Sequence, residues 1–560
     1  MPSLKTILTN IKRVFLAKQN TILSAAGLIM FMIIASRILG LVRQRVLAHY
    51  FLSSELSLFF AAFRLPDTIF EVLVFGTFAS AFIPVFSKVY RDSKKDAWKL
   101  AGIVANWGII FFILLALIVI VFADYLYAIV TPGFGPNEQD QIVLIARLLF
   151  AAQGFFVISY VLTAVLESSK RFFVSSLAPL FYNLGIIILT ILLSGRLGLL
   201  APALGVVVGA LLHFLIQLPL ALRLGFRFIP SLKIGPDVKK IAKLSIPRMI
   251  EVSFLQLAKF AELSLASLIS LSSYTYFTFG NTIQLLPVGL FGTSIAKAAL
   301  PTLASQADDL NLFKKTLFDT LNQIVFLMTP IVVFLIVARV PIVRLVFGTD
   351  IFTWDSTVQT SLVVSAFAIG IFSQSANSIL ARSFYALSDT KTPVFVSVPI
   401  ILFNILLNIV FVMVYKLPVW SLALSFSVSS ILQTMILFIL INKRISGGPI
   451  KSFFVNLAKS VTAGLLSFWV MYFILKFFDK SAWIKRLSFL TSNDFLPFEM
   501  FVLDTRYTVN LMILTFFVAV FGIGTYFIVL ILLKSEELSL FKRLFARFIK
   551  SPAVEETRPS

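Results

Sequence analysis

The sequence predicts an all-α integral membrane protein with about 14 transmembrane helices, arranged as two six-helix lobes around a central cavity plus two C-terminal helices. Of its 560 residues, 59% are apolar and only 13% are charged, and the mean hydropathy is +0.97. A water-soluble globular chain has about half of its residues apolar and about a quarter charged. The composition therefore excludes a soluble protein.

Apolar stretches separated by Gly, Pro and charged residues mark the expected helices. A helix needs about 20 apolar residues to cross the hydrocarbon core of a bilayer. The stretches that reach about this length are 22–48, 56–87, 100–128, 142–166, 175–195, 199–222, 242–270, 274–304, 317–338, 358–386, 393–415, 418–441, 456–477 and 508–533. The first stretch continues past Arg37 without a small-residue cleavage site, so we expect no removable signal peptide.

A polar segment near the middle of the chain indicates how the helices are grouped. Residues 223–241 contain prolines, glycines and several basic residues, a composition typical of a surface linker. We therefore expect a first lobe, a cytoplasmic linker, a second lobe, an appended pair of helices and a basic cytoplasmic tail, at 1–222, 223–241, 242–441, 442–535 and 536–560 respectively.

Basic residues are unequally distributed between alternate loops. If the amino terminus is cytoplasmic, loops on that side contain roughly 30 Lys and Arg residues and loops on the other side about 9, which satisfies the positive-inside rule. We therefore expect both termini to be cytoplasmic. The same excess accounts for the net charge of +22, so nucleic acid is not expected as a partner.

Several kinds of chemistry have no support in the sequence. There is no cysteine, and the two histidines, His49 and His213, are far apart in the chain, so no metal site is expected. There is no G-x-x-x-x-G-K-[ST] loop for ATP and no acid, base and nucleophile constellation. We therefore expect a secondary transporter with no catalytic residues and no cofactor, coupled to an ion gradient such as that of Na⁺, to the membrane potential or to the substrate's own gradient.

Arginines and carboxylates inside the first two predicted spans are candidate functional residues. An arginine near the bilayer centre costs at least about 2.5 kcal/mol, so it usually faces a partner or a water-filled cavity. The first span contains Arg37 near its middle and Arg43 further along. In the second span, Arg64 and Glu71 lie on one face together with Asp67, and these residues can either pair with one another or line a cavity.

The seventh predicted span has the clearest polar stripe. Arg248, Glu251, Lys259 and Glu262 fall within an arc of roughly 80° when drawn at helical spacing. Each cation is three residues from a carboxylate and can pair with it inside the helix. The stripe indicates a substrate pathway, although a buried polar seam between helices gives the same pattern.

Two asparagines in the eleventh predicted span add to the polar residues. Asn404 and Asn408 are one turn apart and suit either ion coupling or hydrogen bonding between helices. A cavity with arginines and carboxylates suits an anionic, hydrated headgroup, because arginine binds phosphate through two parallel hydrogen bonds. From the same residues, an exporter of organic cations that uses Glu71, Glu251 and Glu262 is an alternative.

Particular motifs resemble a known family. ASRILGLVRQRVLAHYF and FFAAFRLPDTIFEVLVFGTFASAFIPVFSK, at 35–51 and 59–88, resemble the amino-terminal signature of the MurJ/MviN lipid II flippases. That family lies within the larger group that also contains drug exporters and polysaccharide flippases. Further similar motifs follow in the same order: VTPGF at 130–134, SLAPLFYN at 176–183, HFLIQLP at 213–219, LLPVGLFGTSIAKAALPTL at 285–303 and ARSFYALSDTKTP at 381–393.

The resemblance implies a function and a set of roles. It implies a monomeric flippase of the bacterial plasma membrane that moves lipid II, an undecaprenyl-diphosphate-linked peptidoglycan precursor, to the outer leaflet by alternating access. It also implies that the last two helices, within 442–535, form a groove for the lipid tail. Arg37, Arg43 and Arg64 stand at basic positions of the family, and Arg248 and Lys259 of the polar stripe complete the expected substrate-binding residues. The expected polar or coupling residues are Glu71, Glu251, Glu262, Asn404 and Asn408. Glu71 and Thr282 stand where the family has arginines, so another polyprenyl-diphosphate-linked oligosaccharide is an alternative substrate.

Overall fold

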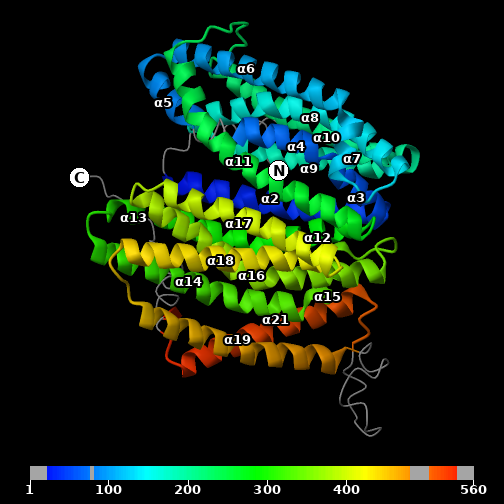
Figure 1. The fold of residues 1–560 in the computed structure, drawn as a ribbon, viewed down its shortest axis with the longest axis vertical. Coiled ribbons are helices and arrows are strands. Elements are labelled where there is room, and N and C mark those ends of the chain that lie inside the picture. Colours follow the sequence, from blue (N-terminus) through cyan, green and yellow to red (C-terminus); the bar gives the residue numbers. More distant parts are fainter. Residues whose placement is uncertain (1–21, 76–80, 480–502, 536, 539–560) are drawn as a thin grey trace, which may run out of the picture. The chain divides into compact units, whose positions relative to one another are not determined.

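The described part of the protein is almost entirely helical. The computed structural model describes residues 22–75, 81–479, 503–535 and 537–538 (Figure 1). Within these residues, twelve helical segments are long and apolar enough to cross a membrane, judged by length and composition. These segments correspond to the third through the fourteenth predicted spans, so the prediction of an all-α membrane protein is confirmed.

The first two predicted spans are not among these twelve segments, which were found among the described residues alone. Helix α2 (Ile22–Tyr50) covers the first one. The second is a broken series rather than one regular helix: α3 (Ser53–Ala62), α4 (Arg64–Phe70), the π-helix η1 (Glu71–Phe75) and α5 (Ile83–Asp92). Pro66 lies inside α4, where its ring removes a backbone donor and favours the break. The total of fourteen spans stays a prediction.

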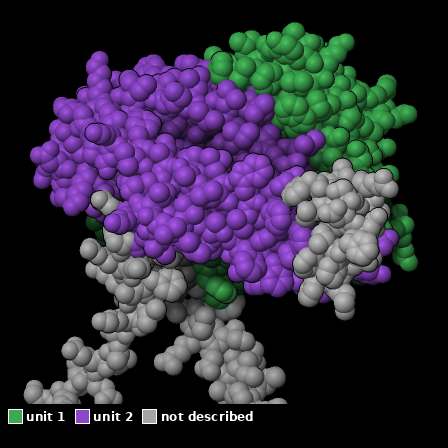
Figure 2. All heavy atoms as spheres, turned by 90° about the horizontal axis from the view of Figure 1, so that it is seen from below, with its two compact units in different colours: residues 1–282, 346–360, 401–422 green, residues 283–345, 361–400, 423–560 purple. Residues whose placement is uncertain are grey.

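The chain forms two compact units, coloured separately in Figure 2. The first contains residues 1–282, 346–360 and 401–422, and the second contains the remainder. The further helices of the first unit are α6 (Lys94–Val121), α7 (Ala123–Val130), α8 (Pro136–Ser168), α9 (Phe172–Leu197), α10 (Leu200–Arg223) and α11 (Pro236–Ile269). The predicted lobe boundaries and central cavity stay predictions.

The second unit contains the carboxyl-terminal helices. Its own helical segments are η3 (Val288–Thr293), α13 (Ser294–Ser305), α14 (Leu310–Val337), α15 (Arg339–Phe347), α18 (Trp420–Arg444), α19 (Ile450–Phe478) and α21 (Thr508–Leu532). A few residues at the ends of α15 and α18 belong to the first unit. The residues of α12 (Ser273–Pro287), α16 (Trp354–Ala386) and α17 (Lys391–Ile409) are divided between the units, and η4 (Val410–Val414) belongs to the first.

Helices α14, α19 and α21 pack together inside the second unit. The Tyr526 hydroxyl donates to the Phe326 carbonyl at 2.9 Å, and the Ser467 hydroxyl donates to the Gly522 carbonyl at 2.7 Å. Such hydrogen bonds hold membrane helices together where the hydrophobic effect contributes little. The expected lipid groove along the last two helices stays a prediction.

The turn before α17 is built around Asp389. Its carboxylate accepts hydrogen bonds from the Lys391 and Thr392 backbone N–H groups, at 3.1 and 3.0 Å, and from the Thr392 hydroxyl at 2.7 Å. These bonds hold the pKa of Asp389 below its ordinary value. The contribution of this cap to stability is complete at neutral pH, and it is lost only as the pH falls through that lowered pKa.

Glycines allow α9 and α10 to approach closely. A Cβ atom added at Gly185 would lie 2.6 Å from the Gly209 Cα atom, and one added at Gly205 would lie 2.7 Å from the Ile186 Cα atom. Small residues at a membrane helix interface let two backbones come into contact. The close packing of α9 against α10 therefore requires glycine, which has no side chain, at these positions.

Gly185→Ala should lower the free energy of unfolding by about 1–3 kcal/mol, because the added methyl group meets backbone that must move. The measurement is thermal unfolding of the purified protein in detergent. Gly195→Ala is the matched control on the same helix, since nothing lies within 4 Å of its added Cβ atom. Equal melting temperatures for the two variants would contradict this account of the interface.

Candidate functional site

An ion pair joins two helices inside the first unit. The Lys259 ammonium on α11 lies 2.7 and 3.1 Å from the two Glu71 carboxylate oxygens on η1. Gln256, one turn earlier on α11, donates to the same carboxylate at 2.6 Å. The two charged side chains are 37% and 26% exposed, so each is partly withdrawn from solvent. Glu71 is therefore neutralised and hydrogen-bonded by a single neighbouring helix.

The helix before η1 is also held by polar contacts. Gln153 on α8 donates to the Asp67 carboxylate at 2.5 Å. The Thr68 hydroxyl bonds the Arg64 carbonyl at 2.7 Å. Glu262 on α11 lies within electrostatic range of Arg64 and Lys259. Side chains from α4, η1, α8 and α11 thus form one polar cluster among apolar helices.

The pairing in this cluster differs from the pairing expected within single helices. Lys259 was expected to pair with Glu262, three residues away on the same helix, but its ion pair is with Glu71. Helix α11 packs against η1, which brings Glu71 within reach of Lys259. Among the described residues, Lys259 and Glu262 form no ion pair. The positive charge of Lys259 is therefore already matched inside the protein.

Arg43 and Arg64, unlike Lys259, form no ion pair among the described residues. The Nε atom of each is buried and has no hydrogen-bond partner among the described residues. The Arg43 guanidinium lies over the Tyr182 ring, 5.9 Å from its centroid, and Tyr182 lies within electrostatic range of Asp67 as well. The Nε–H group of each arginine is therefore a hydrogen-bond donor that no described residue of the protein uses.

Other polar residues of α2 are placed in distinct surroundings. Arg37 is exposed on the helix. Arg45 donates to the Val346 carbonyl at 3.2 Å. Gln44 donates to the Thr282 hydroxyl at 2.9 Å, so the position where the resemblance implies an arginine is here part of a neutral hydrogen bond.

The remaining predicted site residues are the two asparagines of α17 and two charged residues of α11. Asn408 donates to Asn404 at 3.3 Å within α17, and both side chains are buried. Arg248 and Glu251 belong to α11, but their side chains lie outside the described residues. No group of three or more His, Cys, Asp or Glu residues suited to a metal ion occurs among the residues that the structure describes. The expected roles of these residues in binding and coupling stay predictions.

Gln153 and Tyr182 are site residues that were not predicted from the sequence. Gln153 is a single amide inside the apolar stretch 142–166, and its burial at 3% exposure shows that it serves the interior. A buried amide needs a hydrogen-bond partner, so its presence in a span was a usable signal. Tyr182 gave no such signal, because an aromatic residue in a span is ordinary.

A multi-pass helical membrane fold with an interhelical ion pair, and with two arginines whose buried Nε atoms lack hydrogen-bond partners among the described residues, is typical of a membrane transporter. A family model described as "Lipid II flippase MurJ" matches residues 47–492. The chain therefore belongs to the MurJ lipid II flippase family, whose members are transporters rather than enzymes.

Individual relatives agree with this assignment. The chain is 29% identical over 450 residues to the probable lipid II flippase MurJ of Vibrio cholerae serotype O1, covering 76% of this chain and 82% of the relative. A solved structure titled "Lipid II flippase MurJ, inward closed conformation" has a TM-score of 0.71 at 23% identity, covering 90% of this chain and 99% of the other. An inward-facing multidrug resistance MATE family transporter has a TM-score of 0.60 at 13% identity, covering 73% and 94%. The two solved structures establish the fold.

A double-mutant cycle on Glu71→Gln and Lys259→Met should give a coupling energy of about 1 kcal/mol, because the pair is partly shielded from solvent. The measurement is the unfolding free energy, or the melting temperature, of the two single variants and the double variant. Asp124→Asn with Arg147→Met is the matched control, since that pair is 3.5 Å apart and 67% and 49% exposed. Equal coupling in both cycles would show that burial does not strengthen the Glu71–Lys259 pair.

Proposed function

We propose that this chain moves lipid II from the inner to the outer leaflet of the bacterial plasma membrane for peptidoglycan synthesis. The observation that supports this most directly is the pair of buried Nε atoms of Arg43 and Arg64, which lack hydrogen-bond partners among the described residues. A buried donor without a partner costs about 1–3 kcal/mol, a cost that a bound ligand removes. A planar guanidinium matches the oxygens of a diphosphate.

The acidic residue at position 71 is compatible with an anionic substrate. A free carboxylate would repel a diphosphate, but Glu71 is paired with Lys259 and accepts a hydrogen bond from Gln256. The charge of Glu71 is therefore balanced by Lys259. Arg43 and Arg64 offer guanidinium groups to the diphosphate, and Arg64 also lies within electrostatic range of Asp67, Glu71 and Glu262. The same pairing argues against a cation exporter that uses Glu71, because its carboxylate is already occupied.

The energy source, orientation and assembly complete the proposal. The diphosphate of lipid II is negatively charged, and its movement out of a cell that is negative inside is favoured by about 2.3 kcal/mol per charge for each 100 mV. We therefore infer coupling to the membrane potential, with Na⁺ coupling as the alternative. The distribution of basic residues supports cytoplasmic amino and carboxyl termini. We further propose that the protein alternates its access as a monomer, with Arg37 as an additional substrate contact.

Arg43→Ala and Arg64→Ala should each weaken lipid II retention on the order of tenfold, because each removes a charge-assisted hydrogen bond to the diphosphate. Native mass spectrometry of the purified protein with lipid II measures this retention. Arg45→Ala is the control, since the Arg45 guanidinium already bonds the Val346 carbonyl. Unchanged retention in both Arg43→Ala and Arg64→Ala would remove the basis of the proposal.

A second ligand tests the identity of the glycan. An undecaprenyl-diphosphate sugar without the muropeptide is offered at the same concentration as lipid II. Preferential retention of lipid II supports the proposed substrate. Equal retention of both, lost in Arg43→Ala, would replace lipid II with the wider class of polyprenyl-diphosphate sugars.

A further inference from the structure

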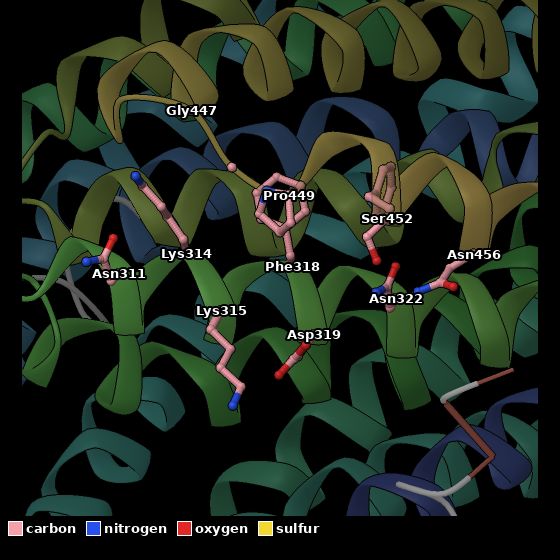
Figure 3. A pocket seen from close by; sticks show the side chains of 12 residues that line it. Asn311, Lys314, Lys315, Phe318, Asp319, Asn322, Gly447, Pro449, Ser452 and Asn456 are labelled. Atoms are coloured by element: carbon pink, nitrogen blue, oxygen red, sulfur yellow. The ribbon is translucent and has the colours of Figure 1, made fainter.

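Two neighbouring clefts lie beside residues 446–449, the loop between α18 and α19 in the second unit. The polar cleft, about 320 Å³ in volume, is shown in Figure 3, and its lining includes Lys314, Lys315, Asp319, Asn322, Gly447 and Asn456. The apolar cleft, about 680 Å³ in volume, has a lining that includes Met435, Phe438, Ile439, Lys443, Gly447 and Phe454. Gly447 lines both clefts, so they adjoin at the loop.

The charges around these clefts favour an anion. Lys314 and Lys315 line the polar cleft, Lys443 lines the apolar cleft, and Asp319 is the single carboxylate in either lining. The Lys314 ammonium lies 3.4 Å from the Ser446 carbonyl, which holds it beside the loop. Three lysines against one aspartate leave the linings with a net positive charge. A phosphate group between α14 and the loop would match this charge.

Two asparagine side-chain oxygens in the linings of these clefts favour a ligand that also donates hydrogen bonds. The Asn322 Oδ1 atom is buried and has no hydrogen-bond partner among the described residues, and the same holds for Asn442 Oδ1. Figure 3 shows the Asn322 and Asn456 side chains extending toward one another from α14 and α19. An unsatisfied acceptor calls for a donor such as a hydroxyl group. The polar cleft thus suits a phosphate that bears a hydroxylated substituent.

The apolar cleft supplies a surface for a hydrocarbon chain. Met435, Ile439 and Phe454 are 56%, 62% and 52% exposed on the membrane-spanning helices α18 and α19. The Phe438 and Phe453 rings stack at 5.4 Å, and both rings contact the Phe318 ring of α14. Exposed apolar side chains on a membrane helix contact lipid, so an acyl chain can lie along this surface.

We propose that the two clefts together bind one anionic phospholipid with a hydroxyl-bearing headgroup, such as a phosphatidylglycerol. Its phosphodiester lies near Lys314 and Lys315, its headgroup hydroxyl donates to Asn322, and one acyl chain passes Gly447 into the apolar cleft. By the predicted topology, this lipid belongs to the cytoplasmic leaflet. The site involves none of the arginines assigned to lipid II, so each proposal stands or fails separately.

Native mass spectrometry of the full chain in detergent tests this site without lipid II present. The probes are phosphatidylglycerol, phosphatidylmethanol and phosphatidylcholine with identical acyl chains, together with inorganic phosphate. We expect the double variant Lys314→Gln/Lys315→Gln to retain phosphatidylglycerol on the order of tenfold less than the unmodified protein, since each lysine near an anionic group strengthens binding several-fold. The matched control is Lys94→Gln/Lys95→Gln, which removes two adjacent exposed lysines at the start of α6.

Asn322→Leu tests the part assigned to the hydroxyl group. The unmodified protein should retain phosphatidylglycerol more strongly than phosphatidylmethanol, which is anionic but has no headgroup hydroxyl, and Asn322→Leu should abolish this preference. Equal retention of phosphatidylcholine, equal losses in the two double-lysine variants, or phosphate retained as strongly as the lipid would each overturn the proposal. Phosphatidylglycerol retention unchanged in Lys314→Gln/Lys315→Gln would also overturn it.

Discussion

A charged side chain among apolar helices requires a partner, and the Glu71–Lys259 ion pair shows how the first unit meets this requirement. Lys259 and Gln256 reach Glu71 from α11, which fixes α11 against η1. Gln153 bonds Asp67 in the same way and joins α8 to the preceding helix. Because the lost solvation of each carboxylate is offset by these contacts, four helical segments are held in one arrangement.

This arrangement separates cations with a structural role from cations available to a ligand. Lys259 and Arg45 already have partners in the protein, whereas the buried Nε atoms of Arg43 and Arg64 have none among the described residues. The unused hydrogen-bonding capacity therefore lies on these two guanidinium groups, which are always ionised and bind phosphate oxygens in pairs. An anionic headgroup and the internal ion pair do not compete for the same groups. A carboxylate at position 71 is thus consistent with an anionic substrate.

The fold was predictable from the sequence to a much greater degree than the site. Apolar stretches of sufficient length give helices whether or not their neighbours are known, so α21 at Thr508–Leu532 matches the expected 508–533 closely. The π-helix at Glu71–Phe75 was not predictable, because helical spacing assumes a regular 100° turn throughout. The pairing of Glu71 with Lys259 joins residues 188 apart in the chain and depends on how α11 packs. Local spacing favoured partners within one helix because it contains no information about neighbouring helices.

The first unit is completed by segments from the second half of the chain. Arg45 bonds the Val346 carbonyl, the Thr349 hydroxyl donates to the Ala48 carbonyl, and Ser53 bonds Ser356, so the end of α2 is joined to residues about 300 positions later. A chain emerging from the ribosome cannot make these bonds until residues 346–356 have been synthesised. Because synthesis proceeds at about 5–20 residues per second, the end of α2 waits roughly 15–60 s for its partners. During that interval, the polar groups at the end of α2 must be satisfied by water, lipid headgroups or the membrane insertion machinery.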